Sequence, residues 1–192
     1  MTRIIAGLAR GRRLEVVASG TRPTSDRARE GLFNTLQTLL DFDGLRVLDL
    51  YAGSGAIGLE ALSRGAEQAT MVERGRTAAQ VLRKNVTTVG LPGGVVVEQP
   101  VELYLSTSVA PGPAQQPRSG FDLVVADPPY AMTQEELDPV LRALVSPGWL
   151  SPDAVVVIER SARGPAMLWP AELEELKQKR YGEAALWYGQ QR

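Results

Sequence analysis

Four consecutive residues, Asp127-Pro128-Pro129-Tyr130, have the clearest chemical capacity in the chain. The two prolines have a fixed φ and no N–H, so the backbone carbonyls beside them can point into a site instead of joining a sheet. The Asp127 carboxylate and the Pro128 carbonyl could accept the two N–H bonds of a planar exocyclic amine and aim its lone pair at a methyl group. Tyr130 could stack on the ring that bears the amine. We therefore predict catalysis on such an amine; a plain proline-rich turn is the structural alternative.

Two missing residue types narrow the chemistry. The chain contains no histidine and no cysteine, which excludes a cysteine nucleophile, a Ser-His-Asp relay and the usual Cys/His zinc sites. Catalysis must then use carboxylates, backbone groups, aromatic faces and a cofactor, and we expect no metal. Placement of the reactants and fixed dipoles would supply most of the acceleration.

A second segment predicts where a cofactor binds. An apolar run that contains Asp49 ends in closely spaced glycines and passes into a helical pattern, which indicates a strand, a tight turn and a helix. Gly53, Gly55 and Gly58 fit the G-x-G-x-x-G fingerprint of dinucleotide sites. Glu73 lies 20 residues past the first of these glycines, where an acid that binds ribose is expected. By itself, this pattern leaves the identity of the nucleotide cofactor open.

Asp49 distinguishes between the possible cofactors. It stands at the end of the strand, just before the glycine turn, and would face whatever the turn holds. A carboxylate repels a diphosphate and attracts an ammonium or sulfonium group. S-adenosylmethionine (AdoMet) has both cations and no phosphate, so the sequence favours AdoMet, with NAD(P) as the first rival. In a purely structural role, Asp49 would cap the turn or the following helix.

Size and composition indicate one ordinary globular domain. The chain has 192 residues, of which 44% are hydrophobic and 22% charged, enough for a buried core. No apolar run approaches the ~20 residues that a membrane helix needs, and we expect no membrane association. From residue 45 the apolar pattern alternates between strands and helices. The predicted strands are 46–50, 69–73, 95–98, 121–126, 154–159, 173–180 and 184–188.

The predicted helices lie between these strands. They cover 56–64, 77–89 and the stretch from the capping box Thr133-x-x-Glu136 to Val145. An earlier helix should begin at Thr24 or Ser25 and present Leu32, Phe33, Leu36, Leu39 and Leu40 on one face. This order predicts an α/β fold: a seven-stranded, mostly parallel sheet, covered on both faces, with one antiparallel edge strand. The proline-rich stretch 106–120 should be a mobile surface loop.

In such sheets, ligands lie beyond the carboxyl ends of the strands. Asp49, Glu73, the pair Glu98-Gln99 and Asp127 all fall at or just past a predicted strand end, so they should converge. We expect Asp49 and the Gly53–Gly55 backbone near the methionine part of AdoMet, Glu73 on the ribose hydroxyls, and Gln99 near the adenine amine. The whole predicted cofactor set is Asp49, Tyr51, Ala52, Gly53, Ser54, Gly55, Glu73, Arg74, Gln99 and Asp127.

The amino-terminal segment is basic, although the whole chain carries a formal net charge of −1. Residues 1–30 hold seven arginines against three acids, a net +4, which leaves −5 for the other 162 residues. Such an asymmetry attracts phosphate, although a basic stretch is often only solvated surface. Two short β-prone runs, Ile4-Ile5 and Leu14–Val17, predict a hairpin with a basic tip. We therefore divide the chain into a hairpin extension with its linker, 1–24, and a main domain, 25–192.

Taken together, these motifs resemble a known family. The Asp49–Gly55 segment, Glu73 and the Asp-Pro-Pro-Tyr tetrad look like those of class I AdoMet-dependent methyltransferases, which have a Rossmann-like fold and here would act on exocyclic amines. Three further segments are similar to the RsmD-like family, which methylates the N2 amine of one guanine in small-subunit (16S) ribosomal RNA. They are Ile4–Gly7 with Arg10-Gly11-Arg12, Arg22–Glu30 with Leu32-Phe33-Asn34, and Glu60–Ala66.

The resemblance covers nearly the whole chain and implies a cytoplasmic enzyme, expected to be a monomer, that acts on ribosomal RNA in a partly assembled 30S particle. It implies that Asp127 to Tyr130 hold a flipped guanine. It also implies that the arginine-rich hairpin and the segment after it face RNA. The predicted RNA-binding residues are Arg3, Arg10, Arg12, Arg13, Arg22, Thr24 and Arg27. One departure is Gln99-Pro100, where many relatives have Asp or Asn followed by Ala, and the stretch 106–120 has no assigned family role.

Three other functions stay open at this stage. The glycine fingerprint also fits an NAD(P)-dependent oxidoreductase, against which Asp49 argues. A chain that binds ribosomal RNA as an assembly factor without turnover would share the basic segment, but would not need an intact Asp-Pro-Pro-Tyr. Among methyltransferases, adenine N6 and glutamine N5 are the nearest alternative targets, because the tetrad can hold any planar amine.

Overall fold

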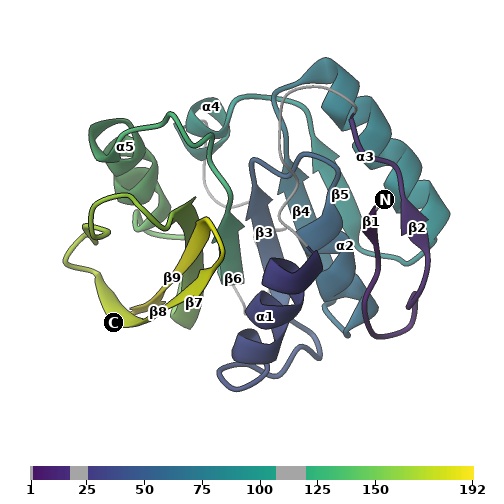
Figure 1. Ribbon diagram of the computed structural model, residues 1–192, viewed down its shortest axis with the longest axis horizontal. Helices are drawn as coiled ribbons and strands as arrows, with labels where there is room; N and C mark the ends of the chain where they lie inside the picture. Colours follow the sequence, from purple (N-terminus) through teal and green to yellow (C-terminus); the bar gives the residue numbers. More distant parts are fainter. Residues whose placement is uncertain (1, 18–25, 107–119) are drawn as a thin grey trace.

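The apolar runs from residue 46 onward form one seven-stranded sheet in the order β5-β4-β3-β6-β7-β9-β8 (Figure 1). The structure is a computed structural model that describes residues 2–17, 26–106 and 120–192. The strands are β3 (Arg46–Leu50), β4 (Gln68–Val72), β5 (Gly94–Val97), β6 (Phe121–Ala126), β7 (Leu150–Ser161), β8 (Leu173–Tyr181) and β9 (Ala184–Gln191). The neighbours from β5 to β7 pair in parallel, and β9 runs antiparallel to both β7 and β8. The predicted mostly parallel α/β sheet with antiparallel pairing at one edge is confirmed.

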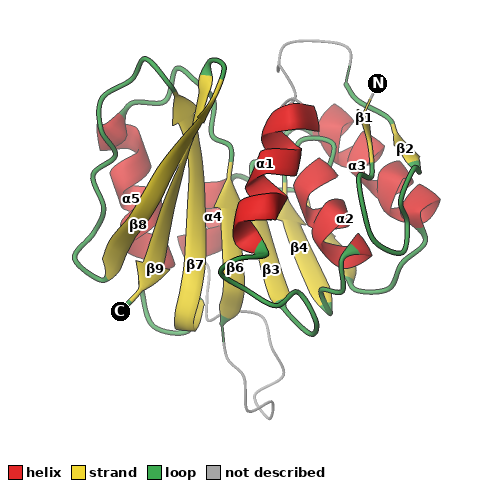
Figure 2. Cartoon of the chain, turned by 60° about the horizontal axis from the view of Figure 1, so that its bottom comes forward, coloured by secondary structure: helices red, strands yellow, loops and turns green. Residues whose placement is uncertain are grey.

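Helices cover both faces of the sheet (Figure 2). On one face lie α1 (Asp26–Leu36), α2 (Ala56–Ser63) and α3 (Arg76–Val89), and on the other lie α4 (Val101–Ser106) and α5 (Gln134–Leu144). Strand side chains alternate between two hydrophobic cores: Val47 packs with α1 to α3, and Leu48 with α4 and α5. All five residues of β3 are buried, as expected for a central parallel strand covered on both sides.

Local chemistry fixes several helix ends. At the start of α5, Thr133 Oγ1 accepts a hydrogen bond from the Glu136 N–H at 3.3 Å, and Glu136 Oε2 accepts one from the Thr133 N–H at 2.7 Å. These reciprocal bonds form the predicted capping box. The carboxyl end of α3 is also defined locally: the helix stops at Gly90, whose φ of 62° is a left-handed conformation that ends a helix.

Some predicted boundaries differ from the structure. Strand β7 begins at Leu150, before the predicted start at residue 154, because Phe121 on β6 pairs with Leu150. Helix α1 ends at Leu36, and Leu39 and Leu40 pack against the core from the turn that follows. The predicted helix cap at Thr24 or Ser25 falls outside the described residues, as does 107–119, most of the predicted loop.

The predicted amino-terminal hairpin is present, but its strands are short. Strand β1 (Thr2–Arg3) pairs antiparallel with β2 (Arg13–Leu14), two residues each. Between them, Ile4 still bonds to Gly11 and Arg12 across the hairpin. The next two N–H groups bond to α2 instead: Ile5 and Ala6 donate to the two carboxylate oxygens of Glu60 at 2.7 and 3.0 Å. The hairpin is therefore fastened to α2 by a buried side chain.

Further contacts strengthen this attachment. The Ala9 N–H donates to Ser63 Oγ at 2.9 Å, and the Leu8 N–H donates to the Ser63 carbonyl at 2.7 Å. Gly7 has a φ of +81°, and a Cβ on it would overlap the Ser63 carbonyl, so only glycine fits there. Arg64 pairs with Glu60 at 2.9 Å and lies over the ring of Phe33 on α1. Residues 60–66, one of the segments that resemble the RsmD-like family, therefore have a structural role in holding the hairpin.

Within the described part of the chain, every helix is too short or too polar to cross a lipid bilayer.

Candidate functional site

Three of the predicted acids meet at the carboxyl edge of the sheet. Asp49 is the fourth residue of β3, Glu73 follows β4, and Asp127 follows β6; β4 and β6 are the two neighbours of β3. Both Asp127 and Glu73 lie near enough to raise the pKa of Asp49 by charge repulsion. These three acids come from separate strand ends in the sequence, and in the structure they lie at one edge of the sheet, as the sequence predicted.

Asp49 is the most perturbed acid of this group. Its exposed fraction is 2%, and its Oδ2 accepts the Gly58 N–H in the first turn of α2 at 2.9 Å. Burial raises its pKa to about 7, the Gly58 hydrogen bond opposes that shift, and repulsion from Asp127 and Glu73 adds to it. Asp49 therefore has the capping role that was its structural alternative. A cation beside these acids would relieve the repulsion, whereas a diphosphate would increase it.

The glycine turn after β3 has an unusual backbone. Tyr51 has a φ of +61°, a rare conformation for a residue with a side chain. Gly55 has a φ of +78°, and a Cβ there would overlap the Leu82 side chain of α3. The Glu73 carboxylate holds the turn, because it accepts the N–H of Gly53 at 2.9 Å and that of Gly75 at 2.6 Å. A carboxylate has about four lone-pair sites, so Glu73 could also accept ribose hydroxyls.

Asn85 is a site residue that the sequence analysis did not identify. Its side chain is buried in α3 and donates to the Ser54 carbonyl of the glycine turn at 2.8 Å. The same amide accepts the Glu15 N–H and donates to the Glu15 carbonyl, both at 2.9 Å. One side chain therefore joins the glycine turn to the chain leaving the hairpin. A polar residue on the buried face of an amphipathic helix was the available signal.

The other predicted cofactor residues surround the same edge. The Tyr51 hydroxyl donates to Glu102 Oε1 at 3.4 Å, and its pKa is raised by burial first and then by the Glu102 carboxylate. The Ala52 N–H donates to the Val72 carbonyl at 3.0 Å. Arg74 is exposed, and Gln99 is half-buried between β5 and α4.

The tetrad continues from β6 into a well-anchored turn. The Asp127 N–H donates to the Leu50 carbonyl at 3.3 Å, and the Met132 N–H donates to the Pro129 carbonyl at 2.8 Å. Arg160 of β7 donates to the Met132 carbonyl at 2.6 Å, and burial lowers the pKa of its guanidinium. Tyr130 is 52% exposed, so about half of the residue is accessible to a ligand. Its hydroxyl donates to Glu159 Oε1 at 3.2 Å.

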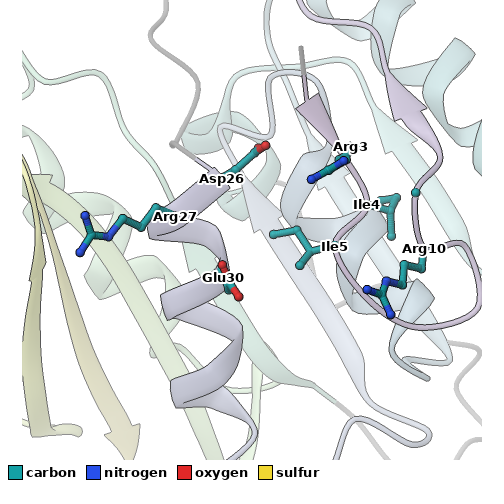
Figure 3. A pocket seen from close by; sticks show the side chains of 8 residues that line it. Arg3, Ile4, Ile5, Arg10, Asp26, Arg27 and Glu30 are labelled. Atoms are coloured by element: carbon teal, nitrogen blue, oxygen red, sulfur yellow. The ribbon is translucent and has the colours of Figure 1, made fainter.

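A separate hollow of about 380 Å³ lies between the hairpin and the first turns of α1 (Figure 3). Arg3 and Arg10 line it from the hairpin, while the Arg27 side chain extends from α1 away from both. The remaining lining residues are Ile4, Ile5, Gly11, Asp26 and Glu30. Two predicted RNA-binding residues, Arg22 and Thr24, fall outside the described residues.

The other two hairpin arginines differ in their surroundings. Arg13 is exposed. The Arg12 guanidinium donates to the Thr88 carbonyl at 2.9 Å and also to the Val89 carbonyl, in the last turn of α3. A cation is favourable at that end of a helix, so Arg12 helps to dock the hairpin.

Comparison with known proteins gives consistent matches over nearly the whole chain. A family model described as "Conserved hypothetical protein 95" matches residues 2–190. The ribosomal RNA small subunit methyltransferase D of Haemophilus influenzae is 38% identical over 183 residues, which cover 94% of this chain and 89% of that protein. Its Escherichia coli K12 counterpart is 36% identical over 184 residues, 95% of this chain and 86% of that one. The solved structure of a putative methyltransferase from Escherichia coli has a TM-score of 0.83 at 34% identity, covering 100% of this chain and 98% of that chain.

Proposed function

The chain belongs to the RsmD family, whose model is described as conserved hypothetical protein 95, and from this we propose that it methylates ribosomal RNA with AdoMet as donor. We further propose that the target is the exocyclic N2 amine of one guanine in small-subunit (16S) ribosomal RNA, modified during ribosome assembly. The observation that carries the proposal is the adjacency of two strand ends: buried Asp49 lies on β3, and Asp127, the first residue of the tetrad, directly follows neighbouring β6.

The electrostatics of this edge support AdoMet over a dinucleotide. Asp49 is buried, and the two charged groups that raise its pKa by repulsion, Asp127 and Glu73, are both negative. A ligand with an ammonium and a sulfonium group offsets this charge, and a diphosphate would add to it. The residues that would hold AdoMet are Asp49, the Gly53–Gly55 backbone and Glu73, with Gln99 near the adenine.

The chemistry of the tetrad follows from its geometry. AdoMet, when bound, supplies a methyl carbon that is activated by the adjacent sulfonium. Asp127 and the Pro128 carbonyl accept the two N–H bonds of the guanine amine, which turns the nitrogen lone pair out of conjugation with the ring. Tyr130 stacks on the base. Asp127 stabilises the positive charge that develops on the nitrogen and then accepts the departing proton. No step requires a histidine, because placement and fixed charge supply the acceleration.

The hairpin supplies the RNA-binding surface in this proposal. Arg3 and Arg10 face the hollow beside α1, and Arg13 is exposed on the second strand of the hairpin. Guanidinium groups suit phosphate recognition because they donate several hydrogen bonds in a plane. Accordingly, we assign residues 1–24 to RNA binding and residues 25–192 to AdoMet binding and catalysis.

The test is transfer of labelled methyl from AdoMet to small-subunit ribosomal RNA, both as a naked transcript and as 30S particles from a strain that lacks the protein. Mass spectrometry of the product should find one N2-methylguanine. Asp127→Ala should lower transfer by at least about a hundredfold while AdoMet still binds, since it removes an acceptor that acts on the amine. Asp41→Ala is the control, because Asp41 is exposed and precedes β3 at its amino end.

Three results would count against parts of the proposal. Methyladenine in the RNA, or methylglutamine in a ribosomal protein, would support methyltransferase activity but show that the target is not guanine N2. Binding of NAD(P) without AdoMet would favour an oxidoreductase. Tight RNA binding without turnover would favour an assembly factor.

A further inference from the structure

Glu159 is a buried acid next to the tetrad that the proposed mechanism does not yet use. It lies near the carboxyl end of β7, the strand beside β6, and only 3% of it is exposed. Its Oε1 accepts the hydroxyl of Tyr130 at 3.2 Å. Burying a carboxylate costs free energy unless it is hydrogen-bonded, and the Tyr130 hydroxyl is one group that stabilises Glu159 there.

Glu159 completes a row of acids across four neighbouring strands. In the order β4-β3-β6-β7, the strands carry Glu73, Asp49, Asp127 and Glu159 at their carboxyl ends. Side chains two residues apart on a strand point to the same face. The residues two positions earlier are Met71, Val47, Val125 and Val157, all in the core under α1 to α3. The four acids therefore share one face of the sheet.

Position in the row suggests a division of roles. Adjacent strands are about 4.8 Å apart, so Glu159 is a near neighbour of Asp127 and lies two strands from Asp49. The first two acids adjoin the glycine turn, where the cofactor is proposed to bind, and the last two adjoin Tyr130, where the base is proposed to stack. Carboxylates in such a row can accept hydrogen bonds from organic ligands.

We propose that Glu159 accepts the N1–H of the target guanine while Asp127 holds its N2 amine. This inference rests on the proposed function and deepens it, because it names the group that selects guanine. The Watson–Crick edge of guanine presents N1–H and N2–H donors side by side, and enzymes that flip a base recognise it through that edge. Adenine presents an N1 acceptor at the equivalent position, and a carboxylate opposite that acceptor would be repelled.

The hydrogen bond from Tyr130 to Glu159 is compatible with this role. A carboxylate has about four lone-pair sites, so accepting the Tyr130 hydroxyl does not prevent Glu159 from accepting guanine N1–H. If the role of Glu159 is only to orient Tyr130, it contributes to base selection through the Tyr130 ring. The two possibilities differ in what removal of the Tyr130 hydroxyl does to base selection.

The experiment compares two bases at one position. The methylated nucleotide is first located by mass spectrometry in the wild-type reaction, and semisynthetic small-subunit RNA then carries guanine or 2-aminopurine there. 2-Aminopurine keeps the N2 amine but has an N1 acceptor in place of N1–H. Wild-type kcat/KM should favour guanine by about 10- to 100-fold, the usual range for one well-placed base contact.

Variants of Glu159 and Tyr130 show which of the two residues produces the preference for guanine. Glu159→Gln should reduce the preference to within about threefold, because the amide can accept from guanine N1–H or donate to the N1 of 2-aminopurine. Tyr130→Phe should keep the wild-type ratio, whatever it does to the rate, since Glu159 remains. AdoMet affinity of Glu159→Gln, measured by calorimetry, should stay within about twofold of wild type because Glu159 lies two strands from Asp49.

The outcomes separate this inference from the proposed function. An unchanged ratio in Glu159→Gln, or an equal loss of preference in Tyr130→Phe, would overturn the role of Glu159 and leave the methyltransferase standing. Absence of any methyl transfer by the wild-type protein would remove the proposed function itself. If Glu159→Gln does not fold, the wild type and Glu159→Asp provide the test. Equal wild-type kcat/KM on guanine and 2-aminopurine would refute the proposal. So would a preference for guanine in Glu159→Asp that is as large as in the wild type.

Discussion

The side-chain amide of Asn85 donates a hydrogen bond to the carbonyl of Ser54 at 2.8 Å. Ser54 belongs to the glycine turn proposed to hold AdoMet, and the same amide bonds both backbone groups of Glu15 beyond the hairpin. A single buried side chain thus supports the glycine turn and the chain that leaves the hairpin.

Asn85→Ala should weaken AdoMet binding and lower stability together. The substitution leaves three backbone groups without their partner, which costs about 1–3 kcal/mol for each group that water cannot reach. Calorimetric titration with AdoMet and thermal unfolding measure the two effects. Thr87→Ala is the matched control, because Thr87 is exposed on the same helix and bonds only within it. An AdoMet affinity equal to wild type in Asn85→Ala would show that the turn does not need this support.

AdoMet affinity should rise with pH through about 7. Free Asp49 has a pKa of about 7, raised by burial, and a cationic ligand binds best when this carboxylate is ionised. Below that pH the proton must leave first, so affinity should fall by up to about tenfold per pH unit. Asp49→Asn should bind more weakly at pH 8 and lose this dependence. Calorimetry between pH 5.5 and 8.5 checks it; a pH-independent wild type would contradict the role given to Asp49.

The same shift predicts a pH effect on folding without ligand. The pKa of the Asp49 carboxyl group is higher in the folded protein than in the unfolded chain. The contribution of such a group to stability is fully present below the pKa of the unfolded chain, and it is lost as the pH rises through the pKa of the folded protein. The free energy of unfolding of the wild type should therefore decline between pH 5 and 8 by more than that of Asp49→Asn. Urea unfolding at both pH values provides the measurement. Parallel declines in the two proteins would mean that Asp49 is already ionised when buried.

Glu60→Ala should release the hairpin. The substitution removes the acceptor of the Ile5 and Ala6 N–H groups and leaves buried Arg64 without its partner, a loss of about 3–5 kcal/mol for a broken buried pair. Thermal unfolding and limited proteolysis near residue 10 report it. Glu67→Ala, at an exposed acid just after α2, should behave as wild type. RNA affinity of Glu60→Ala should fall further than its AdoMet affinity, and the reverse order would argue against a docked RNA-binding hairpin.

The hairpin arginines should separate into two classes. Replacing Arg10 and Arg13 with alanine should flatten the salt dependence of RNA binding, by about 0.7 to 0.9 in log–log slope for each phosphate that the variant no longer neutralises. Arg12→Ala should mainly lower thermal stability, because its guanidinium caps α3. Filter binding between 50 and 300 mM salt measures the slope. A slope unchanged in the Arg10/Arg13 double variant would exclude both residues from the RNA interface.

Much of the sheet could be predicted because most of its strands are apolar runs that are bounded by polar, glycine or proline residues. Strands β3 and β6 match their predicted bounds, and the Thr133 capping box marks the start of α5. The rule that ligands lie past strand ends also predicted the convergence of Asp49, Glu73 and Asp127.

What the sequence could not predict depends on tertiary contacts. The hairpin strands are shorter than Ile4-Ile5 and Leu14–Val17 suggest, and the N–H groups of Ile5 and Ala6 donate to Glu60 instead of to a partner strand. Asn85 lies on the buried face of an amphipathic helix, but that pattern does not show which backbone groups its amide binds. Glu159, in contrast, follows the same strand-end rule as Asp49 and was available from the sequence.

The fastening of the hairpin to α2 has a consequence for substrate choice. Because Glu60 and Ser63 anchor residues 5–9, and Asn85 ties the outgoing chain to the glycine turn, the arginines stand at a set separation from Tyr130. If the proposed roles hold, an RNA segment would be methylated only when its backbone reaches these arginines while the target base reaches Tyr130. The fixed distance between the two sites would then select the substrate together with the identity of the base.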